Sequence, residues 1–142
     1  LLTRKSKAWL AEGGYPPGPL LTADPAGAIS GWRFKSAKLA ALRREFPATA
    51  IGIGDKLSDA QSYVDNGLTA YLIPHCDRKD PRKLRVLAAE IRALRGQGRL
   101  QVVDGWKQIE DGIFHAAQFP PEKYADQLEL QAAKLEAERE RK

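Results

Sequence analysis

The sequence contains no methionine, a single cysteine and no apolar run long enough to cross a membrane. Because a translated chain normally begins with methionine, its complete absence predicts that this chain of 142 residues either has lost its start or is a fragment of a longer protein. The lone cysteine, Cys76, excludes a disulfide within the chain. The first residues form no secretory signal, and together these features predict a protein of a reducing compartment, the cytoplasm.

Hydrophobic residues make up 43% of the chain and charged residues 29%, which is enough apolar material for one domain with its own core. The formal net charge is +5. A basic surface suits a phosphate-bearing substrate or an anionic membrane surface, although ordinary surface charge is the simpler explanation. No nucleic-acid-binding motif accompanies the positive charge, so a nucleic acid partner is not expected.

Two apolar runs, residues 50–54 and 68–73, frame the most informative stretch of the chain. The first has residues too small for a surface helix and predicts a strand buried on both faces. Ser58 is expected to cap a helix that reaches Asn66, and Gly67 suits the left-handed turn that ends a helix. Strand, helix and strand in this order predict a βαβ crossover, and therefore an α/β fold with a parallel sheet.

Two carboxylates follow the first of these strands. Asp55 comes directly after Gly54, and Asp59 lies four residues further along. Ligands of parallel α/β sheets bind outside the carboxyl ends of the strands. The sequence therefore places both carboxylates where a functional site is expected.

The remaining elements follow from apolar spacing and capping residues. Asp80 and Pro81 predict the start of one helix, and Asp104 is expected to cap another. Helices are predicted over residues 2–12, 36–46, 81–95, 104–113 and 122–142, and short strands over residues 20–22 and 100–103. We divide the chain into a partial α/β domain, residues 1–118, and a charged C-terminal helix, residues 119–142. That helix has a thin apolar seam, and it either packs on the body, pairs with another chain or frays.

The stretch Gly54-Asp55-Lys56-Leu57-Ser58-Asp59-Ala60, followed by Tyr63, resembles the fourth motif of the haloacid dehalogenase superfamily. Phe34-Lys35-Ser36-Ala37-Lys38-Leu39 resembles its third motif, which supplies a lysine. The segment from Trp9 to Leu20 is similar to the one that follows the second motif in the lipin-like phosphatidate phosphatases. The resemblance extends over residues 2–73, with three pieces in the family's order.

The resemblance implies a Rossmann-like, three-layer α/β sandwich and a phosphatase that uses Mg²⁺. Asp55 would supply an oxygen ligand to Mg²⁺, and Asp59 would hold Asp55, a water on the metal or the lysine. Lys35 would bind the phosphoryl oxygens, with Lys38 as the alternative lysine of the motif. The implied substrate is a phosphorylated small molecule or lipid.

One part of the family's pattern is absent. Members carry their nucleophile in an Asp-x-Asp motif on the first strand, and no Asp-x-Asp precedes Asp55 here. We therefore expect the N-terminal strands and the nucleophile to lie before Leu1, and this chain to be inactive alone. Without those strands the sheet would have unpaired inner edges.

Three functions remain open. The first is part of a phosphomonoester hydrolase that acts through an aspartyl-phosphate. The second is a non-catalytic, lipin-like domain that binds an anionic lipid or a phosphorylated partner, with peripheral contact to an anionic membrane. The third is an α/β interaction domain that uses its C-terminal helix.

Overall fold

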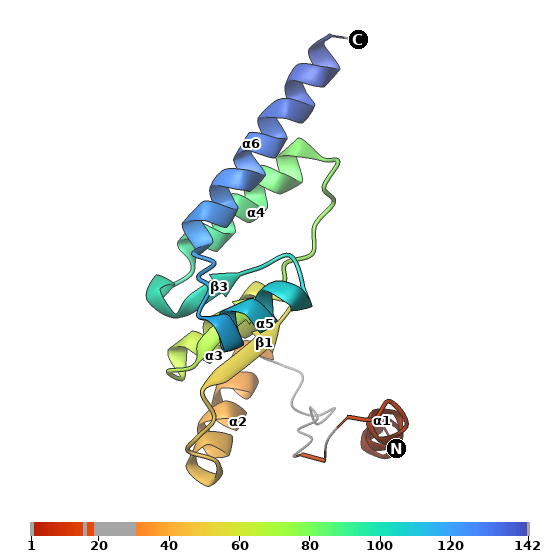
Figure 1. Ribbon diagram of the computed structural model, residues 1–142, viewed down its shortest axis with the longest axis vertical. Coiled ribbons are helices and arrows are strands. Elements are labelled where there is room, and N and C mark those ends of the chain that lie inside the picture. Colours follow the sequence, from red (N-terminus) through yellow and green to blue (C-terminus); the bar gives the residue numbers. More distant parts are fainter. Residues whose placement is uncertain (1, 16, 19–30, 142) are drawn as a thin grey trace.

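The computed structural model describes residues 2–15, 17–18 and 31–141, and within them helices pack on both faces of a three-stranded parallel sheet (Figure 1). The prediction of an α/β fold is confirmed, whereas the strand expected at residues 20–22 lies outside the described residues. The elements are α1 (Leu2–Glu12), α2 (Gly31–Glu45), β1 (Ile51–Gly54), α3 (Leu57–Asp65), β2 (Thr69–Leu72), α4 (Pro81–Ala93), a 3₁₀ turn (Gln97–Arg99), β3 (Leu100–Val102), α5 (Trp106–His115) and α6 (Pro121–Glu140).

The sheet has the order β1-β2-β3, with both pairs parallel. Ile51 is level with Thr69 in the first pair, and Ala70 is level with Leu100 in the second. Helix α3 makes the crossover from β1 to β2, as predicted. Gly67 follows it with a φ of 76°, the left-handed conformation that a side chain would strain.

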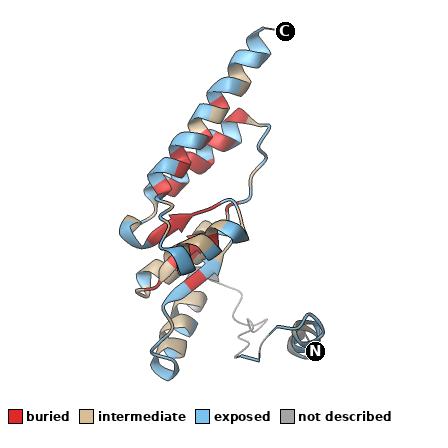
Figure 2. Cartoon of the chain, viewed as in Figure 1, coloured by how far each residue is buried: buried red, intermediate tan, exposed pale blue. Residues whose placement is uncertain are grey.

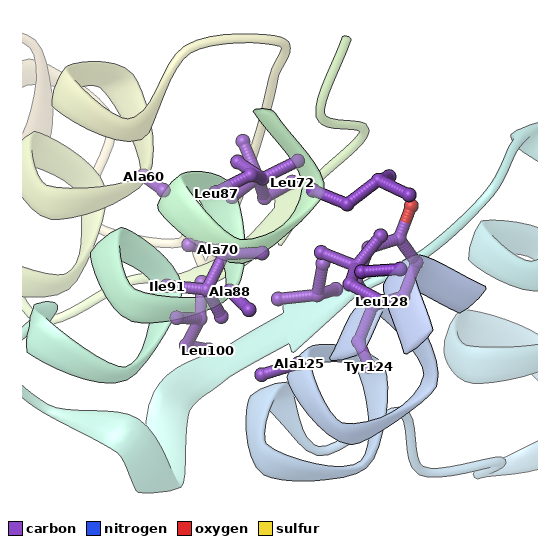
Figure 3. Packing of buried hydrophobic residues seen from close by; sticks show 13 residues of the cluster. Ala60, Ala70, Leu72, Leu87, Ala88, Ile91, Leu100, Tyr124, Ala125 and Leu128 are labelled. Atoms are coloured by element: carbon purple, nitrogen blue, oxygen red, sulfur yellow. The ribbon is translucent and has the colours of Figure 1, made fainter. Parts of the chain in front are cut away.

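One face of the sheet carries the main core (Figure 3). Ala70, Leu72 and Leu100 point to this face, because side chains alternate along a strand. They pack against the apolar stripe of α4 and against α6. The buried members of the cluster are Ala60, Ala70, Leu72, Leu84, Leu87, Ala88, Ile91, Leu100, Val102, Tyr124, Ala125, Leu128 and Ala132.

The opposite face is covered less completely. Ile109 of α5 packs there with Tyr71 and Val103. Ile51 and Ile53 of β1 remain 38% and 36% exposed, so the prediction that this strand is buried on both faces is wrong (Figure 2). The physical reason is that both isoleucines point to the face of α5, whose apolar cluster forms around Tyr71 and Val103 and includes no residue of β1. In addition, β1 is an edge strand, since no described strand pairs with its outer side.

The C-terminal helix packs on the body of the protein. Helix α6 lies along α4, and Tyr124, Leu128 and Ala132 are buried between them (Figure 1). Arg92 pairs with Asp126 and Glu129 near the start of α6, whereas Arg85 pairs with Glu136 near its end. The two helices are therefore antiparallel. Of the three expectations for this segment, packing on the body is the one confirmed.

Several helix boundaries differ from the prediction. Helix α2 begins at Gly31, five residues early, because nothing in residues 31–35 interrupts a helix. Helix α3 is capped at Lys56, so Ser58 lies in its first turn and is not the cap. Gly105, not Asp104, precedes α5. The cap at Asp80 is confirmed, because its side chain accepts a hydrogen bond from the Arg82 backbone at 3.0 Å.

None of the helices in the described part of the chain is both long enough and apolar enough to cross a membrane.

The contact between α4 and α6 predicts a contrast between two leucines of α6. Leu128 is fully buried, whereas Leu130 is 59% exposed. We expect Leu128→Ala to lower the free energy of unfolding by about 3 kcal/mol, because it leaves a cavity in the core. Leu130→Ala is the matched control and should change it by less than about 0.5 kcal/mol. Urea denaturation measures both, and equal effects would contradict this packing.

The ion pairs between α4 and α6 predict a pH dependence. Hydrogen bonds from Arg85 and Arg92 hold the pKa values of Glu136 and Glu129 below their ordinary value of 4.5. The resulting stabilisation is present above pH 4.5 and is lost as the pH falls through the lowered pKa values. We therefore expect the urea midpoints of the wild type and Glu136→Gln to converge below pH 4.5. A difference that stays constant down to about pH 3 would contradict the shift.

Candidate functional site

Asp55 stands at the carboxyl edge of the sheet. It follows Gly54, the last residue of β1. The Ile73 amide donates a hydrogen bond of 3.0 Å to the Gly54 carbonyl. The Asp55 side chain is exposed, and no described residue forms a hydrogen bond or ion pair with its carboxylate. Its oxygens are therefore available to a ligand from solvent.

Asp59 lies beside this strand end, in the first turn of α3. A Cβ added to Gly54 would lie 2.8 Å from the Asp59 Cβ, so glycine permits the close approach of α3 to β1. Lys35 of α2 donates a hydrogen bond to Oδ1 of Asp59. The lysine side chain is 42% exposed and the aspartate only 13%, so the pair closes off Asp59 while the lysine still reaches solvent.

The structure thus brings together the residues that the sequence singled out. The hydrogen bond to Asp59 comes from Lys35, and Lys38 is an exposed residue one turn further along α2. The sequence suggested that Lys35 directly follows a loop. This is wrong, because α2 already begins at Gly31 and Lys35 lies within it. Its position is set by the contact of α2 with α3.

The end of α3 fixes that contact. The Asn66 side chain donates a hydrogen bond to the Ser36 hydroxyl at 2.8 Å, and Arg43 donates one to the Asn66 carbonyl. Cations near a helix C-terminus interact favourably with its exposed carbonyls. Helix α2 is therefore attached to α3 next to Lys35 and again further along, which places the lysine over Asp59.

Tyr63 attaches α3 to β1, on which its ring packs. Its ring lies against Gly52, where any Cβ would overlap it, and its hydroxyl donates a hydrogen bond to the Ile53 carbonyl at 3.2 Å. Burial, followed by the charges of Asp59 and Asp55, raises the pKa of Tyr63. The hydroxyl therefore stays protonated at neutral pH. The sequence indicated Tyr63 only as a position of the motif, because the spacing of residues along the chain does not show that its ring packs on Gly52.

The side chains near Asp55 determine which kind of metal site is possible there. Among the described residues, no three His, Cys, Asp or Glu side chains converge on one point. Asp55 offers an open carboxylate, and Asp59 shares one oxygen with Lys35. Mg²⁺ in phosphate-handling sites commonly takes one or two carboxylates and fills its remaining positions with water and phosphate oxygens. The residues present fit Mg²⁺ in that manner and do not fit a metal enclosed by protein ligands alone.

A second polar cluster lies near the carboxyl end of β3. Arg78 donates hydrogen bonds to Asp104, at 3.0 Å, and to the Tyr124 hydroxyl, and its guanidinium lies 5.5 Å from the tyrosine ring centre. Burial, opposed by the Arg78 charge, raises the pKa of Tyr124 to about 12. The cluster ties the loop after β2 to α6. Sequence reasoning missed it because its members lie up to 46 residues apart.

Comparison with known proteins adds no identification, since no family model, curated protein or solved structure matches the chain. The resemblance to the haloacid dehalogenase motifs therefore stays a prediction. The function has to be argued from the chemistry of the site.

The Lys35–Asp59 ion pair predicts that Lys35 contributes more to stability than an exposed cation elsewhere on α2. Lys35→Met leaves Asp59 largely buried without its cationic partner, so we expect a loss of about 1 to 3 kcal/mol in the free energy of unfolding. Arg44→Met, at an exposed position of the same helix, is the matched control and should cost less than about 0.5 kcal/mol. Urea denaturation of both variants tests this, and equal costs would show that the Lys35 pair contributes nothing specific.

Proposed function

We propose that this chain carries the Mg²⁺-binding and phosphate-binding part of a phosphatase of the haloacid dehalogenase type. One observation supports the proposal most: a lysine–aspartate ion pair lies beside an open carboxylate at the carboxyl end of a parallel strand. A cation and a free carboxylate side by side suit a phosphate group that binds together with a divalent metal.

Each residue has a role in this proposal. Asp55 holds Mg²⁺, which when bound neutralises charge on the phosphate. Lys35 binds the phosphoryl oxygens as a point charge. Asp59 orients Lys35 through their ion pair and keeps its ammonium over the strand end. Tyr63 acts through packing, because it holds α3 against β1.

The nucleophile has to come from elsewhere, since the 142 residues contain no Asp-x-Asp. No strand of the described residues pairs with the outer side of β1, which offers a place for it. A further strand paired in parallel with β1 would run about 4.8 Å away and end at the same edge as Asp55. We propose that such a strand, from another part of the protein, completes the sheet and supplies the attacking carboxylate. Alone, this chain binds and does not turn over.

The missing nucleophile favours a second candidate function. The Lys35–Asp59 pair, without Asp55 or a metal, would serve a domain that binds an anionic lipid headgroup or a phosphorylated partner without hydrolysis. The third candidate, an interaction through the C-terminal helix, has less support. The apolar seam of α6 is already used against α4, which leaves Leu130 as its largely exposed leucine.

The test is a titration of the chain with MgCl₂ and inorganic phosphate, followed through backbone amide NMR signals. We expect residues 54–59 to shift with Mg²⁺, and phosphate to bind more tightly when Mg²⁺ is present. Asp55→Asn should weaken Mg²⁺ binding about tenfold or more, because it removes the charged ligand. Asp126→Asn, at an exposed position on α6, is the matched control.

The outcomes separate the two candidates. Under both candidate functions, the chain alone should not hydrolyse p-nitrophenyl phosphate. Turnover by the chain alone would refute the inference that its nucleophile is missing. Phosphate binding that does not depend on Mg²⁺ or Asp55 would favour the non-catalytic domain. Shifts that are unchanged in Asp55→Asn would rule out the proposed metal ligand.

A further inference from the structure

The Lys35 side chain is not fixed by burial. It is 42% exposed, and the described side chains of its helix, α2, belong to neither apolar cluster. Within the described part of the chain, α2 packs mainly on α3. A lysine has a flexible four-carbon stem, so its ammonium keeps one position only if its helix does. The location of this cation therefore depends on what holds α2 to α3.

Two hydrogen bonds join α2 to Asn66, the C-cap residue of α3. The side-chain NH₂ of Asn66 donates to the Ser36 hydroxyl at 2.8 Å, one residue away from Lys35. The backbone carbonyl of Asn66 accepts a hydrogen bond from the Arg43 guanidinium. Ser36 and Arg43 lie about two turns, or roughly 10 Å, apart on α2. Two attachments at this separation fix the direction of α2 as well as its position.

Asn66 is itself held at the end of α3. Its side-chain NH₂ also donates to the Ser62 carbonyl at 2.8 Å, and its backbone amide donates to the Ser62 and Tyr63 carbonyls at 3.2 and 3.1 Å. The next residue, Gly67, accepts a hydrogen bond of 2.7 Å from Arg99, which directly precedes β3. Asn66 therefore connects α2 to a part of the fold that the sheet holds in place.

The position of Asn66 requires an amide donor. Its NH₂ group serves two acceptors, the Ser36 hydroxyl and the Ser62 carbonyl. An aspartate has nearly the same shape, but when ionised it only accepts hydrogen bonds. Its negative charge would also lie at the C-terminus of α3, where the helix carbonyls disfavour an anion. The side chain at this position thus bears directly on the residue next to Lys35.

We propose that Asn66 and Ser36 are positioning residues for phosphate binding. Their hydrogen bond holds the first half of α2 so that the Lys35 ammonium stays over the end of β1, beside Asp55. Both residues act through Lys35 and do not touch the phosphate. Without this bond, binding would have to restrict the motion of the lysine, which lowers affinity. The inference rests on the proposed function, because it concerns the phosphate that Lys35 binds.

The experiment is a titration with inorganic phosphate in the presence of MgCl₂. Ser36→Ala removes the acceptor and Asn66→Ala removes the donor, and each should weaken phosphate binding about fivefold. Binding of Mg²⁺ alone should change by less than about twofold, because Asp55 makes no contact with either residue. Ser36→Thr keeps a hydroxyl and should bind phosphate as the wild type does. Ser36→Ala is the milder change, and it provides the test even if Asn66→Ala unfolds.

Gln61→Ala is the matched control on α3. The Gln61 side chain accepts a hydrogen bond from the Arg95 backbone amide at 2.9 Å and donates one to Asp65 at 2.7 Å. Its removal costs hydrogen bonds of the same kind as Asn66→Ala, but these lead to α4 and not to α2. We therefore expect Gln61→Ala to leave phosphate affinity within about twofold of the wild type.

The Lys35 ammonium supplies a second readout that needs no phosphate. Hydrogen bonding slows the exchange of lysine NH₃⁺ protons with water, so a held ammonium gives its own ¹⁵N NMR signal. The Lys35 signal, identified by its loss in Lys35→Met, should be present in the wild type, Ser36→Thr and Gln61→Ala. In Ser36→Ala and Asn66→Ala it should be broadened or absent, which a general loss of stability does not predict.

Three results would overturn the proposal. The first is phosphate binding that Lys35→Met abolishes but neither Ser36→Ala nor Asn66→Ala weakens, and this result leaves the proposed function intact. The second is equal weakening in Gln61→Ala, which would show that any loss of stability has the same effect. The third is the absence of phosphate binding by the wild type, which would refute the proposed function as well.

Discussion

Parallel pairing of β2 on both of its sides is the interaction on which the rest of the structure depends. Ala70 and Leu72 are fully buried on one face, and Tyr71 is buried on the other. Because β2 hydrogen-bonds to β1 and β3 together, it aligns the carboxyl ends of all three strands at one edge. Helices α3 and α4 then cover one face and α5 the other. Only a strand without charged side chains can be buried on both faces at low cost, and the apolar run at residues 68–73 provides such a strand.

The same arrangement separates two chemically different regions. At the carboxyl end of β1, the contact of α2 with α3 brings charged groups together, and the Lys35–Asp59 pair lies beside Asp55. At the amino ends, α5 leaves a space over the sheet that is lined without charge. The geometry of both regions depends on small residues, because Gly54 admits Asp59 and Gly112 admits Tyr71. Within the described part of the chain, no strand pairs with the outer side of β1, and this strand carries apolar side chains and none of the charges that protect an exposed sheet edge.

Much of the fold was predictable because it follows from local rules. The two strands around α3, the left-handed Gly67 and the Asp80 cap each depend on a few neighbouring residues. The candidate carboxylates were predictable for the same reason, since a parallel strand always presents its following loop at one edge. Errors arose where a local signal competed with context. Ser58 and Asp104 are good capping residues, yet α3 starts earlier, and Asp104 instead binds Arg78 and Tyr124.

By itself, the sequence determined the alternation of strands and helices, the position of Asp55 and the amphipathic stripe of α4, because each is written in spacing along the chain. Only the tertiary structure decided which lysine meets Asp59, that β1 is a half-exposed edge, and that α6 packs on α4. It alone decided that Tyr71 lines a cleft together with Gly112 and Ile113 of α5. These features join residues far apart in the chain, and their free energies depend on burial and contact, which spacing does not encode.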